Sequence, residues 1–324
     1  MSLIELHRLM LKDEQRNIAY VQAIQKVIKP HHVVCDLGAG SGFLSILCAK
    51  QGAKRIYAIE AAQSAALYLK KIIQNNHCSS QIIVFTAPSY EVELPEKVDV
   101  IVSETFGSHP FEENAHEFLQ DACARFLKKG GIVLPSRVQV YAAPASFEDY
   151  HRAWSLFKSP IHGCDLSAFH ADAMRAMYAQ QAKPDMLLAP GLCLEEVSLG
   201  HPRVPSQREM QQHFVVSRSG LLCGFIQWFS LFLTQDIQLS TAPDFPSTHW
   251  RQIFYCIDLP QKVFIGDEVF FYLTIDTRPQ IGISVSWRIE LMSAGRMRYQ
   301  FNSQREIMTE IKPKNKKRGK KRRE

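Results

Sequence analysis

Long apolar runs, low-complexity stretches and an export signal are all missing from this chain of 324 residues. A membrane helix needs about 18 or more consecutive apolar residues, and the best candidate, residues 221–233, is shorter and is interrupted by Gln227 and Ser230. The 16 glycines and 16 prolines are too few for a collagen-like chain. Glu5 and Arg8 stand where a signal peptide would need an apolar segment. We therefore expect a folded protein without a membrane partner. It would be cytoplasmic, or nuclear if the source is eukaryotic or the protein is delivered to a eukaryotic cell.

A metal-binding pattern is also missing. The eight cysteines include no C-x-x-C pair, and the twelve histidines form no H-E-x-x-H pattern. Cys35, Cys48 and Cys223 lie within apolar runs, where a reduced thiol behaves as a small hydrophobic side chain. We predict reduced cysteines and no metal site.

An excess of positive charge is missing except at one end. The net charge of the chain is +6, but residues 312–324, KPKNKKRGKKRRE, hold nine Lys or Arg and one Glu, a net charge of +8. The rest of the chain therefore has a net charge of −2. A block of like charges without an apolar anchor repels itself and stays disordered, and such blocks bind RNA or acidic partners. We predict a disordered basic tail over residues 312–324 with such a partner; a tail that only solubilises the protein is the alternative.

Strand-like and helix-like segments alternate through the first half. The spacing of apolar residues predicts helices over residues 42–53, 61–76 and 116–131, the last ending at a glycine pair. Short apolar runs predict strands at residues 31–40, 54–60, 81–88 and 98–104. Strands and helices alternating at this spacing indicate a parallel sheet with right-handed crossovers. We predict a doubly wound, Rossmann-like α/β domain over residues 1–135.

The composition changes after Pro135. Segments rich in β-branched and aromatic residues, separated by turn residues, predict an antiparallel β domain over residues 136–311. The strand candidates are residues 137–144, 212–219, 223–234, 251–258 and 268–276. Between the first two, residues from about 150 to 186 have helical character and are predicted to project as an insertion.

The first turn of the α/β half has the composition of a cofactor site. It reads Asp36-Leu37-Gly38-Ala39-Gly40-Ser41-Gly42, and Phe43 stands where a dinucleotide-binding G-x-G-x-x-G has its third glycine, which argues against nicotinamide or flavin. Ligands of doubly wound sheets bind beyond the carboxyl ends of the strands. The glycines allow close approach to a ligand, and Glu60, at the end of the next strand, is an acceptor suited to a ribose diol. Together they predict an adenosyl cofactor; a plain tight turn is the alternative.

Four segments in a fixed order give the chain a specific resemblance. Residues 33–60, VVCDLGAGSGFLSILCAKQGAKRIYAIE, resemble the cofactor motifs of S-adenosyl-methionine-dependent methyltransferases. The other three segments are HRLMLKDEQRNIAYVQAI before the first strand, SETFGSHPFEE after the fourth, and STHWRQIFYCID in the β half. With these the chain resembles the protein arginine methyltransferases from residue 7 to about residue 290. The resemblance implies that S-adenosyl-L-methionine is the cofactor, that arginine in a protein is the substrate, and that the second domain is a β-barrel whose helical insertion is an arm for homodimerisation.

Glu104 and Glu113 are the candidates for binding a guanidinium. Two carboxylates facing it can accept its N–H bonds, hold charge on two nitrogens and direct the third at a methyl group. The pair resembles the family's double-glutamate loop in spacing, and Glu112 is the rival for the second position. Without the resemblance, a solvated acidic loop would be the favoured interpretation.

The resemblance implies further site residues. His249 and Asp13 would form a pair in which the carboxylate orients the imidazole, and Arg16 would bind the carboxylate of the cofactor. The same resemblance places a further set around the cofactor: His7, Met10, Asp36, Gly38, Gly40, Glu60, Ser89, Tyr90 and Glu104. Taken alone, His249 would be a structural histidine, Arg16 a surface arginine and Met10 a core residue.

Departures from the family pattern concern cofactor shielding and substrate shape. The chain starts six residues before His7, so we expect the family's aromatic N-terminal segment, which folds over the cofactor, to be missing. Ser89-Tyr90 replaces a Val-Glu pair beside the adenine, and Thr105-Phe106 replaces a Trp-Met pair after the first glutamate. The sequence therefore does not predict whether the product is monomethylarginine, symmetric dimethylarginine or asymmetric dimethylarginine. Met10 taken by itself favours asymmetric dimethylation.

Two other functions remain open alternatives to arginine methylation. One is a methyltransferase for another nucleophile, such as lysine, a ribosomal protein or RNA, brought to ribonucleoprotein by the tail. The other is a non-catalytic adaptor that keeps the fold. The two-glutamate loop separates the enzymatic alternatives, because a neutral amine or a base nitrogen does not need two carboxylates.

Overall fold

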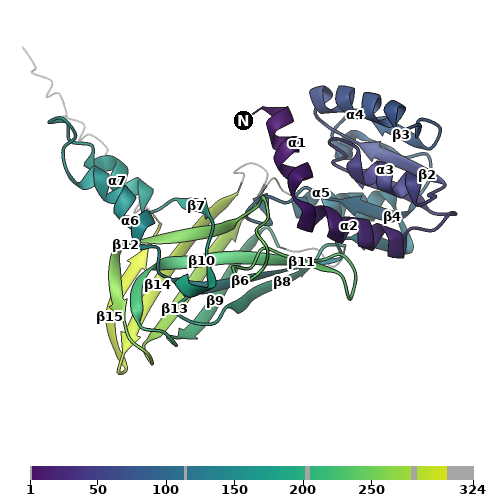
Figure 1. Cartoon of the computed structure of the whole chain (residues 1–324). Helices are drawn as coiled ribbons and strands as arrows, with labels where there is room; N and C mark the ends of the chain where they lie inside the picture. The colour runs from purple at the N-terminus through teal and green to yellow at the C-terminus, as the bar shows by residue number, and fades with distance from the viewer. Residues whose placement is uncertain (1, 113–114, 201–204, 279–282, 305–324) are drawn as a thin grey trace, which may run out of the picture.

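Two halves stand side by side, the first built on a parallel sheet and the second on antiparallel sheets, and a helical projection extends from the second (Figure 1). The computed structural model describes residues 2–112, 115–200, 205–278 and 283–304. Glu113 and the tail of residues 312–324 lie outside the described residues. Among the described residues, no helix combines the length and apolarity needed to cross a membrane.

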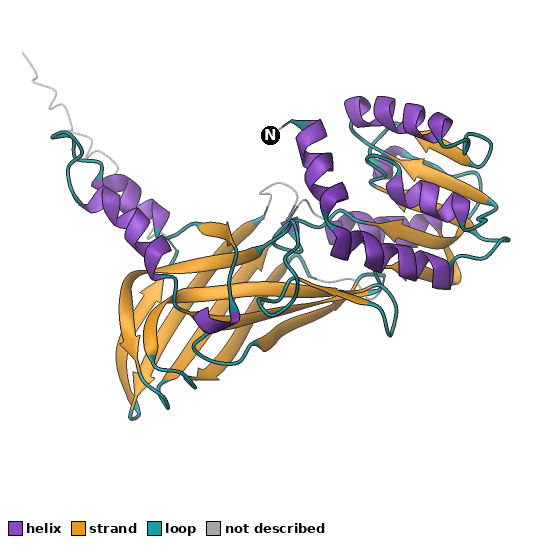
Figure 2. Ribbon diagram, in the orientation of Figure 1, coloured by secondary structure: helices purple, strands orange, loops and turns teal. Residues whose placement is uncertain are grey.

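The first half is a five-stranded parallel sheet in the order β3-β2-β1-β4-β5, flanked by helices (Figure 2). Its strands are β1 (Val33–Leu37), β2 (Arg55–Ile59), β3 (Ile82–Phe85), β4 (Val98–Ser103) and β5 (Leu127–Leu134). Its helices are α1 (Leu3–Lys12), α2 (Glu14–Val27), α3 (Phe43–Lys50), α4 (Gln63–Asn75) and α5 (Ala115–Phe126), with a 3₁₀ turn η1 (Ser89–Glu91). The predicted doubly wound α/β fold is confirmed. The strand order reverses between β1 and β4, where such sheets bind their ligands.

The end of α5 differs from the sequence prediction. A helix was predicted over residues 116–131, but the structure ends α5 at Phe126 and places Leu127–Leu134 in the edge strand β5. β5 pairs with β4 across a register shift, and Gly130 has a positive φ of 77°, which glycine adopts without strain. The glycine pair therefore lies within this register shift, and strand pairing overrides the local helical pattern.

The second half consists of two antiparallel sheets with aromatic side chains between them. One sheet has the order β7-β12-β10-β6-β8 with β11 beside β10, and the other has the order β15-β14-β13-β9. The strands are β6 (Arg137–Ala145), β7 (Met177–Gln180), β8 (Leu192–Ser198), β9 (Gln207–Val215), β10 (Gly220–Phe232), β11 (Gln238–Ser240), β12 (Gln252–Val263), β13 (Glu268–Asp276), β14 (Ser284–Ser293) and β15 (Arg296–Asn302). Phe225 of β10 stacks on Phe271 of β13, with 4.3 Å between ring centres, and joins the two sheets. The predicted antiparallel β half is confirmed.

The helical insertion is shorter than predicted. It consists of α6 (Glu148–Trp154), a 3₁₀ turn η3 (Ser155–Lys158) and α7 (Ser167–Ala173), which project from the β half (Figure 1). Residues 177–180 are not helical, because they form β7 and pair with β12; a second 3₁₀ turn, η4 (Pro184–Met186), follows. Met174 is buried in the apolar cluster of the β half, whereas Leu156 and Phe169 are 58% and 59% exposed. Part of the apolar surface predicted for the insertion is therefore covered within the chain, and part remains exposed.

Candidate active site

The corner between α1 and α2 is organised by Asp13. This residue ends α1 and caps α2, because its Oδ1 accepts the Arg16 backbone N–H at 3.0 Å. Its Oδ2 accepts the His249 backbone N–H at 2.8 Å and lies 2.8 Å from His249 Nδ1. Burial alone would raise the pKa of Asp13, but the hydrogen bonds from His249 and from the Arg16 amide outweigh it and lower that pKa. The predicted Asp13–His249 pair thus forms across the two halves, with the carboxylate ionised and the imidazole held by it.

The loop that carries His249 is fastened to the loop that follows β4. The Trp250 indole N–H donates to the Phe106 carbonyl at 2.6 Å, and the Ser108 hydroxyl donates to the Trp250 carbonyl at 2.6 Å. Trp250 itself is 2% exposed. Two reciprocal hydrogen bonds therefore fix the segment after Glu104 against the β half.

Glu104 follows β4 directly and is paired with Arg16. Arg16 Nε donates to Glu104 Oε2 at 2.6 Å, and the guanidinium Nη2 contacts the same oxygen. The two side chains are 7% and 4% exposed. Burial raises the pKa of Glu104, although the Arg16 guanidinium opposes the shift. In this structure the charge of Arg16 faces Glu104 and holds the first predicted catalytic carboxylate. The binding of a cofactor carboxylate by Arg16 stays a prediction.

The glycine turn after β1 fits a closely approaching ligand. Gly38 and Gly40 have φ values of 74° and 53°. A Cβ on Gly38 would lie 2.4 Å from Thr105 Cγ2, and one on Gly40 would lie 3.0 Å from His7 Cε1. Only glycine combines this backbone conformation with such close neighbours. The third glycine, Gly42, has a φ of 79° and begins α3 against Leu69, which explains its place one residue earlier than in a dinucleotide fingerprint.

Two carboxylates stand at the ends of the neighbouring strands. Glu60, after β2, reaches across the turn: its Oε2 accepts the Gly40 N–H and its Oε1 accepts the Ala62 N–H, both at 2.8 Å. Asp36, in β1, is 1% exposed and accepts the Ser45 hydroxyl at 2.6 Å. Burial raises the pKa of Asp36 to about 6, against the Ser45 hydrogen bonds that lower it. Each oxygen of Glu60 keeps a second lone pair, which suits a diol.

The remaining predicted cofactor residues surround the same turn with less definite roles. His7 lies over Gly40, and burial lowers its pKa. Met10, on the next turn of α1, is half-buried. Ser89 and Tyr90 form η1 after β3; the Ser89 carbonyl accepts Arg125 Nη2 at 2.6 Å, and the Tyr90 side chain is 61% exposed. An exposed ring at this strand end is available to a planar ligand group.

Glu112, the alternative candidate for the second carboxylate, points its side chain toward the backbone of its own loop. Its Oε2 accepts the His109 backbone N–H at 3.3 Å, and its own N–H donates to the His109 carbonyl at 2.9 Å. A Cβ on Gly107 would lie 2.1 Å from Glu112 Oε2, so the carboxylate packs directly over this glycine. Glu112 therefore has a structural position within the loop, and Glu113 stays a prediction because it lies outside the described residues.

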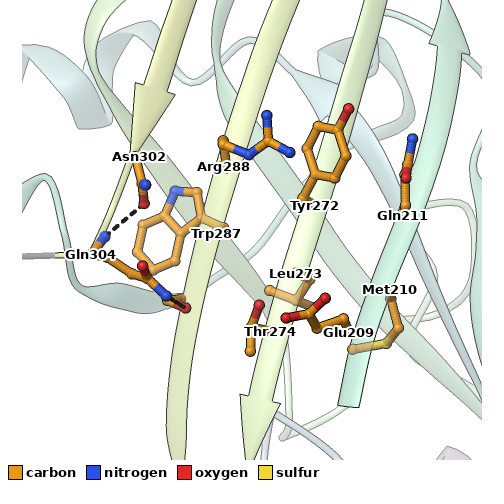
Figure 3. Close-up of a pocket in the computed structure, with 11 residues that line it drawn as sticks. Glu209, Met210, Gln211, Tyr272, Leu273, Thr274, Trp287, Arg288, Asn302 and Gln304 are labelled. Carbon is orange, nitrogen blue, oxygen red and sulfur yellow. Dashed lines mark hydrogen bonds between the residues drawn. The ribbon is translucent and has the colours of Figure 1, made fainter.

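The structure adds residues that the sequence did not predict. Ser108 links the two loops, and Tyr20 of α2, which is fully buried, donates its hydroxyl to the Ser103 carbonyl at 2.9 Å, directly before Glu104. Each of these two hydrogen bonds joins residues far apart in the sequence, so no local sequence pattern could have predicted it. A hollow of about 350 Å³ lies along β9, β13, β14 and β15 and is lined by residues such as Gln211, Tyr272 and Arg288 (Figure 3). None of the predicted site residues lines it.

Removal of the His249 side chain tests the Asp13–His249 pair. For the methyl transfer that the motif resemblance implies, we expect His249→Ala to lower the rate less than a change at Glu104, because water can accept a proton that the imidazole would otherwise take. Steady-state kcat values of wild type and variant give the comparison, and the melting temperature of the variant controls for the loss of the contact with Asp13. A rate loss as large as that of Glu104→Gln would mean that His249 has a larger part than an auxiliary proton acceptor.

Comparison with known proteins gives matches in both halves. Residues 136–292 match the family model of the arginine methyltransferase oligomerization subdomain, and residues 3–140 match that of the TRM5/TYW2 methyltransferase domain. Protein arginine N-methyltransferase 2 of Xenopus tropicalis is 30% identical over 307 residues, which cover 88% of this chain and 70% of that protein. The histone-arginine methyltransferase CARMER of Drosophila ananassae is 31% identical over 273 residues. These residues cover 79% of this chain and 50% of that relative.

Solved structures share the architecture of both halves. The Trypanosoma brucei PRMT1 enzyme–prozyme heterotetrameric complex with AdoHcy contains a chain that matches with a TM-score of 0.83 at 20% identity, covering 92% of this chain and 96% of that one. Protein arginine methyltransferase 10 of Arabidopsis thaliana matches with a TM-score of 0.79 at 24% identity, covering 91% of this chain and 96% of that one. At these identities the structural likeness concerns the fold: a parallel sheet followed by an antiparallel β domain.

Proposed function

The chain belongs to the protein arginine methyltransferases, a family of S-adenosyl-methionine-dependent enzymes, and we propose that it methylates guanidinium nitrogens of arginine in protein substrates. The observation that carries the proposal is the meeting of three segments: Asp13 and Arg16 from the α1–α2 corner, Glu104 after β4, and His249 before β12. Thr105, directly after the buried Glu104, lies against Gly38, so this arrangement places a buried carboxylate close to the glycine turn.

The cofactor would be held by residues of the glycine turn and its neighbours. S-adenosyl-methionine, when bound, supplies an electrophilic methyl group on a sulfonium. Glu60 offers acceptors for a ribose diol, and the backbone at Gly38 and Gly40 allows close approach. We assign Asp36, His7, Met10, Ser89 and Tyr90 to the surroundings of the same ligand.

The protein's own groups then bind and orient the arginine. Glu104 is held in place by Arg16, so its carboxylate is pre-positioned rather than free to rotate. Together with Glu113, it would accept guanidinium N–H bonds, concentrate positive charge on two nitrogens and leave the third as the nucleophile. The Asp13–His249 pair provides an acceptor for the proton released after transfer.

The direct test is transfer of a labelled methyl group from S-adenosyl-methionine to an arginine-rich protein, followed by hydrolysis and amino-acid analysis. Methylarginine is the expected product. Label that appears only in methyllysine would favour lysine, and label that stays in added RNA would favour RNA as substrate. Absence of transfer with retained ligand binding would favour the non-catalytic adaptor. Product identity also decides between monomethyl, symmetric and asymmetric dimethyl forms.

We propose that the helical insertion of α6, η3 and α7 joins two copies of the chain. The match to an oligomerization subdomain supports assembly, and the exposed Leu156 and Phe169 give the insertion an apolar surface that needs a cover. Light scattering at micromolar concentration is expected to give the mass of a dimer. The double change Leu156→Asp and Phe169→Asp should give a folded monomer, because it buries charge in the contact. A monomeric wild type would remove the proposal.

We propose that the basic tail determines which partners the enzyme meets and leaves its chemistry unchanged. With nine cations, residues 312–324 should bind RNA or another acidic partner by counterion release, and this binding should weaken steeply as salt rises. Deletion of these residues should leave turnover of a short peptide within a few-fold. Filter binding at several salt concentrations and peptide kinetics measure the two effects. Complete loss of peptide turnover would assign the tail to the catalytic fold instead. A cytoplasmic location, with nuclear entry in a eukaryotic cell, is part of the same proposal.

A further inference from the structure

Arg208 makes a contact between the two halves that the mechanism above does not use. It lies on β9, and its guanidinium carbon is 4.3 Å from the centre of the Phe111 ring. Phe111 belongs to the loop between β4 and α5, the same loop that begins with Glu104. Both side chains are buried: that of Arg208 is 7% exposed, and Phe111 is 1% exposed. A cation over an aromatic face is attracted to it, and more strongly when both are removed from water.

The guanidinium is fixed by residues of the β half. Arg208 Nε lies 2.8 Å from Glu195 Oε1 on β8, and Nη1 donates to the Pro205 carbonyl at 2.8 Å. Burial raises the pKa of Glu195 and lowers that of Arg208, while each charge partly offsets the shift of the other. A buried ion pair contributes little net stability, since desolvation cancels much of its attraction. Its effect here is geometric: it holds the plane of Arg208 against Phe111.

Phe111 in turn fixes the second part of its loop. Its N–H donates to His109 Nδ1 at 3.3 Å, and its ring lies 5.7 Å from that of His109 and 5.2 Å from that of His116 on α5. Burial and the nearby Arg208 charge lower the pKa of His109 to about 3, so this imidazole is neutral. Glu112 follows Phe111 directly. The aromatic ring is thus a second place, besides the contacts of Trp250, at which the β half contacts the loop after β4.

We propose that Arg208 is a positioning residue, which sets the described part of the loop after β4, from Glu104 to Glu112, through the face of Phe111. The inference rests on the proposed function, because the loop is assigned to binding of the substrate guanidinium. Without the planar cation, the second part of the loop would lose its contact with β9, while the turn of Gly38 and Gly40 would be untouched. Substrate use should therefore suffer and cofactor binding should not.

Arg137 on β6 provides a control with the same kinds of partner, although its side chain is more exposed, at 35% against 7% for Arg208. Its guanidinium carbon lies 3.8 Å from the centre of the Phe232 ring, and its Nη1 lies 2.8 Å from Glu196 Oε2 on β8. Each of the two arginines thus contacts one phenylalanine ring and one glutamate, and both glutamates belong to β8. Both of these partners belong to the β half, however, so within the described residues the ring contact of Arg137 does not involve the loop that follows β4.

Kinetics and fluorine NMR together test the proposal. In Arg208→Met we expect kcat/KM for an arginine peptide to fall on the order of tenfold to 10²-fold, because small displacements of orienting groups have effects of this size. The Kd for S-adenosyl-homocysteine should stay unchanged, and Arg137→Met should retain wild-type kinetics. Arg208→Lys keeps the charge beside Glu195 but not the planar stacking group, and should recover only part of the loss. The double variant Phe111→Leu and Arg208→Met should have a kcat/KM only slightly lower than that of Phe111→Leu alone, since both changes remove the same contact.

The fluorine signal separates this inference from the proposed function. Trp250 donates to the Phe106 carbonyl of the same loop, so 5-fluorotryptophan at position 250, assigned with Trp250→Phe, reports the loop without any turnover. We expect its resonance to shift or broaden in Arg208→Met and to be unchanged in Arg137→Met. An unchanged resonance and unchanged kinetics in folded Arg208→Met would overturn the positioning role. If the wild type methylates no arginine, the proposed function fails while the resonance still tests the contact. Additive losses of kcat/KM in the double variant of Arg208 and Phe111 would also overturn the positioning role of Arg208.

Discussion

Replacement of Glu104 by Gln should lower arginine methylation on the order of 10²-fold or more, because it removes a charge that binds and polarises the guanidinium in the transition state. The change preserves the size of the side chain and leaves an amide oxygen as acceptor for Arg16. The affinity for S-adenosyl-homocysteine should change much less, since the Gly38–Gly40 turn and Glu60 are untouched. Single-turnover rates with saturating cofactor and calorimetry measure the two quantities.

Glu112 and Glu113 provide the comparison for this prediction. Glu113→Gln should resemble Glu104→Gln, whereas Glu112→Gln should remain close to wild type, because its amide oxygen can still accept the His109 N–H. The melting temperature of each variant controls for folding, above all at Glu104, where the buried Arg16 loses its counter-charge. Near-normal rates in both Glu104→Gln and Glu113→Gln, with cofactor bound, would refute the two-carboxylate mechanism. A large loss in Glu112→Gln alone would reassign the second carboxylate to that residue.

Replacement of Glu60 by Ala should weaken cofactor binding by about 10-fold to 100-fold, the range expected for the loss of hydrogen bonds to a charged acceptor. The carboxylate now holds the Gly40 and Ala62 amides, so the variant loses both the shape of the turn and the acceptor for the ribose. Glu60→Gln keeps one acceptor oxygen and should lie between wild type and Glu60→Ala. Calorimetry with S-adenosyl-homocysteine provides the three Kd values. Unchanged affinity in Glu60→Ala would show that the cofactor is bound elsewhere.

Local patterns predicted the parts of the fold that depend on local sequence. The alternation of β1, α3, β2 and α4 follows from runs of apolar residues at strand and helix spacing, and the glycine turn follows from backbone conformations that only glycine adopts easily. The end of α5 was predicted wrongly because pairing with β4 outweighs helix propensity in Leu127–Leu134. The helical insertion was predicted too long because Met177–Gln180 pairs with β12.

The site was predicted only where a motif names its residues. Asp13, Glu104 and His249 came from motif resemblance, and the structure brings Asp13 and His249 into contact and places Arg16 between the α1–α2 corner and Glu104. The Arg16–Glu104 contact joins residues 88 positions apart, and no periodic pattern carries such information. The same holds for Trp250 and Phe106, and for Arg208 and Phe111, whose contacts depend on how the two halves pack.

The most direct test of arginine methylation compares two peptides that differ only in one residue, arginine in one and lysine in the other. With labelled S-adenosyl-methionine, the wild type should methylate the arginine peptide and leave the lysine peptide unlabelled, because two carboxylates suit a delocalised cation with several N–H donors. The predicted result is methylarginine in the first peptide, lost in Glu104→Gln. Equal or greater labelling of the lysine peptide would contradict the account.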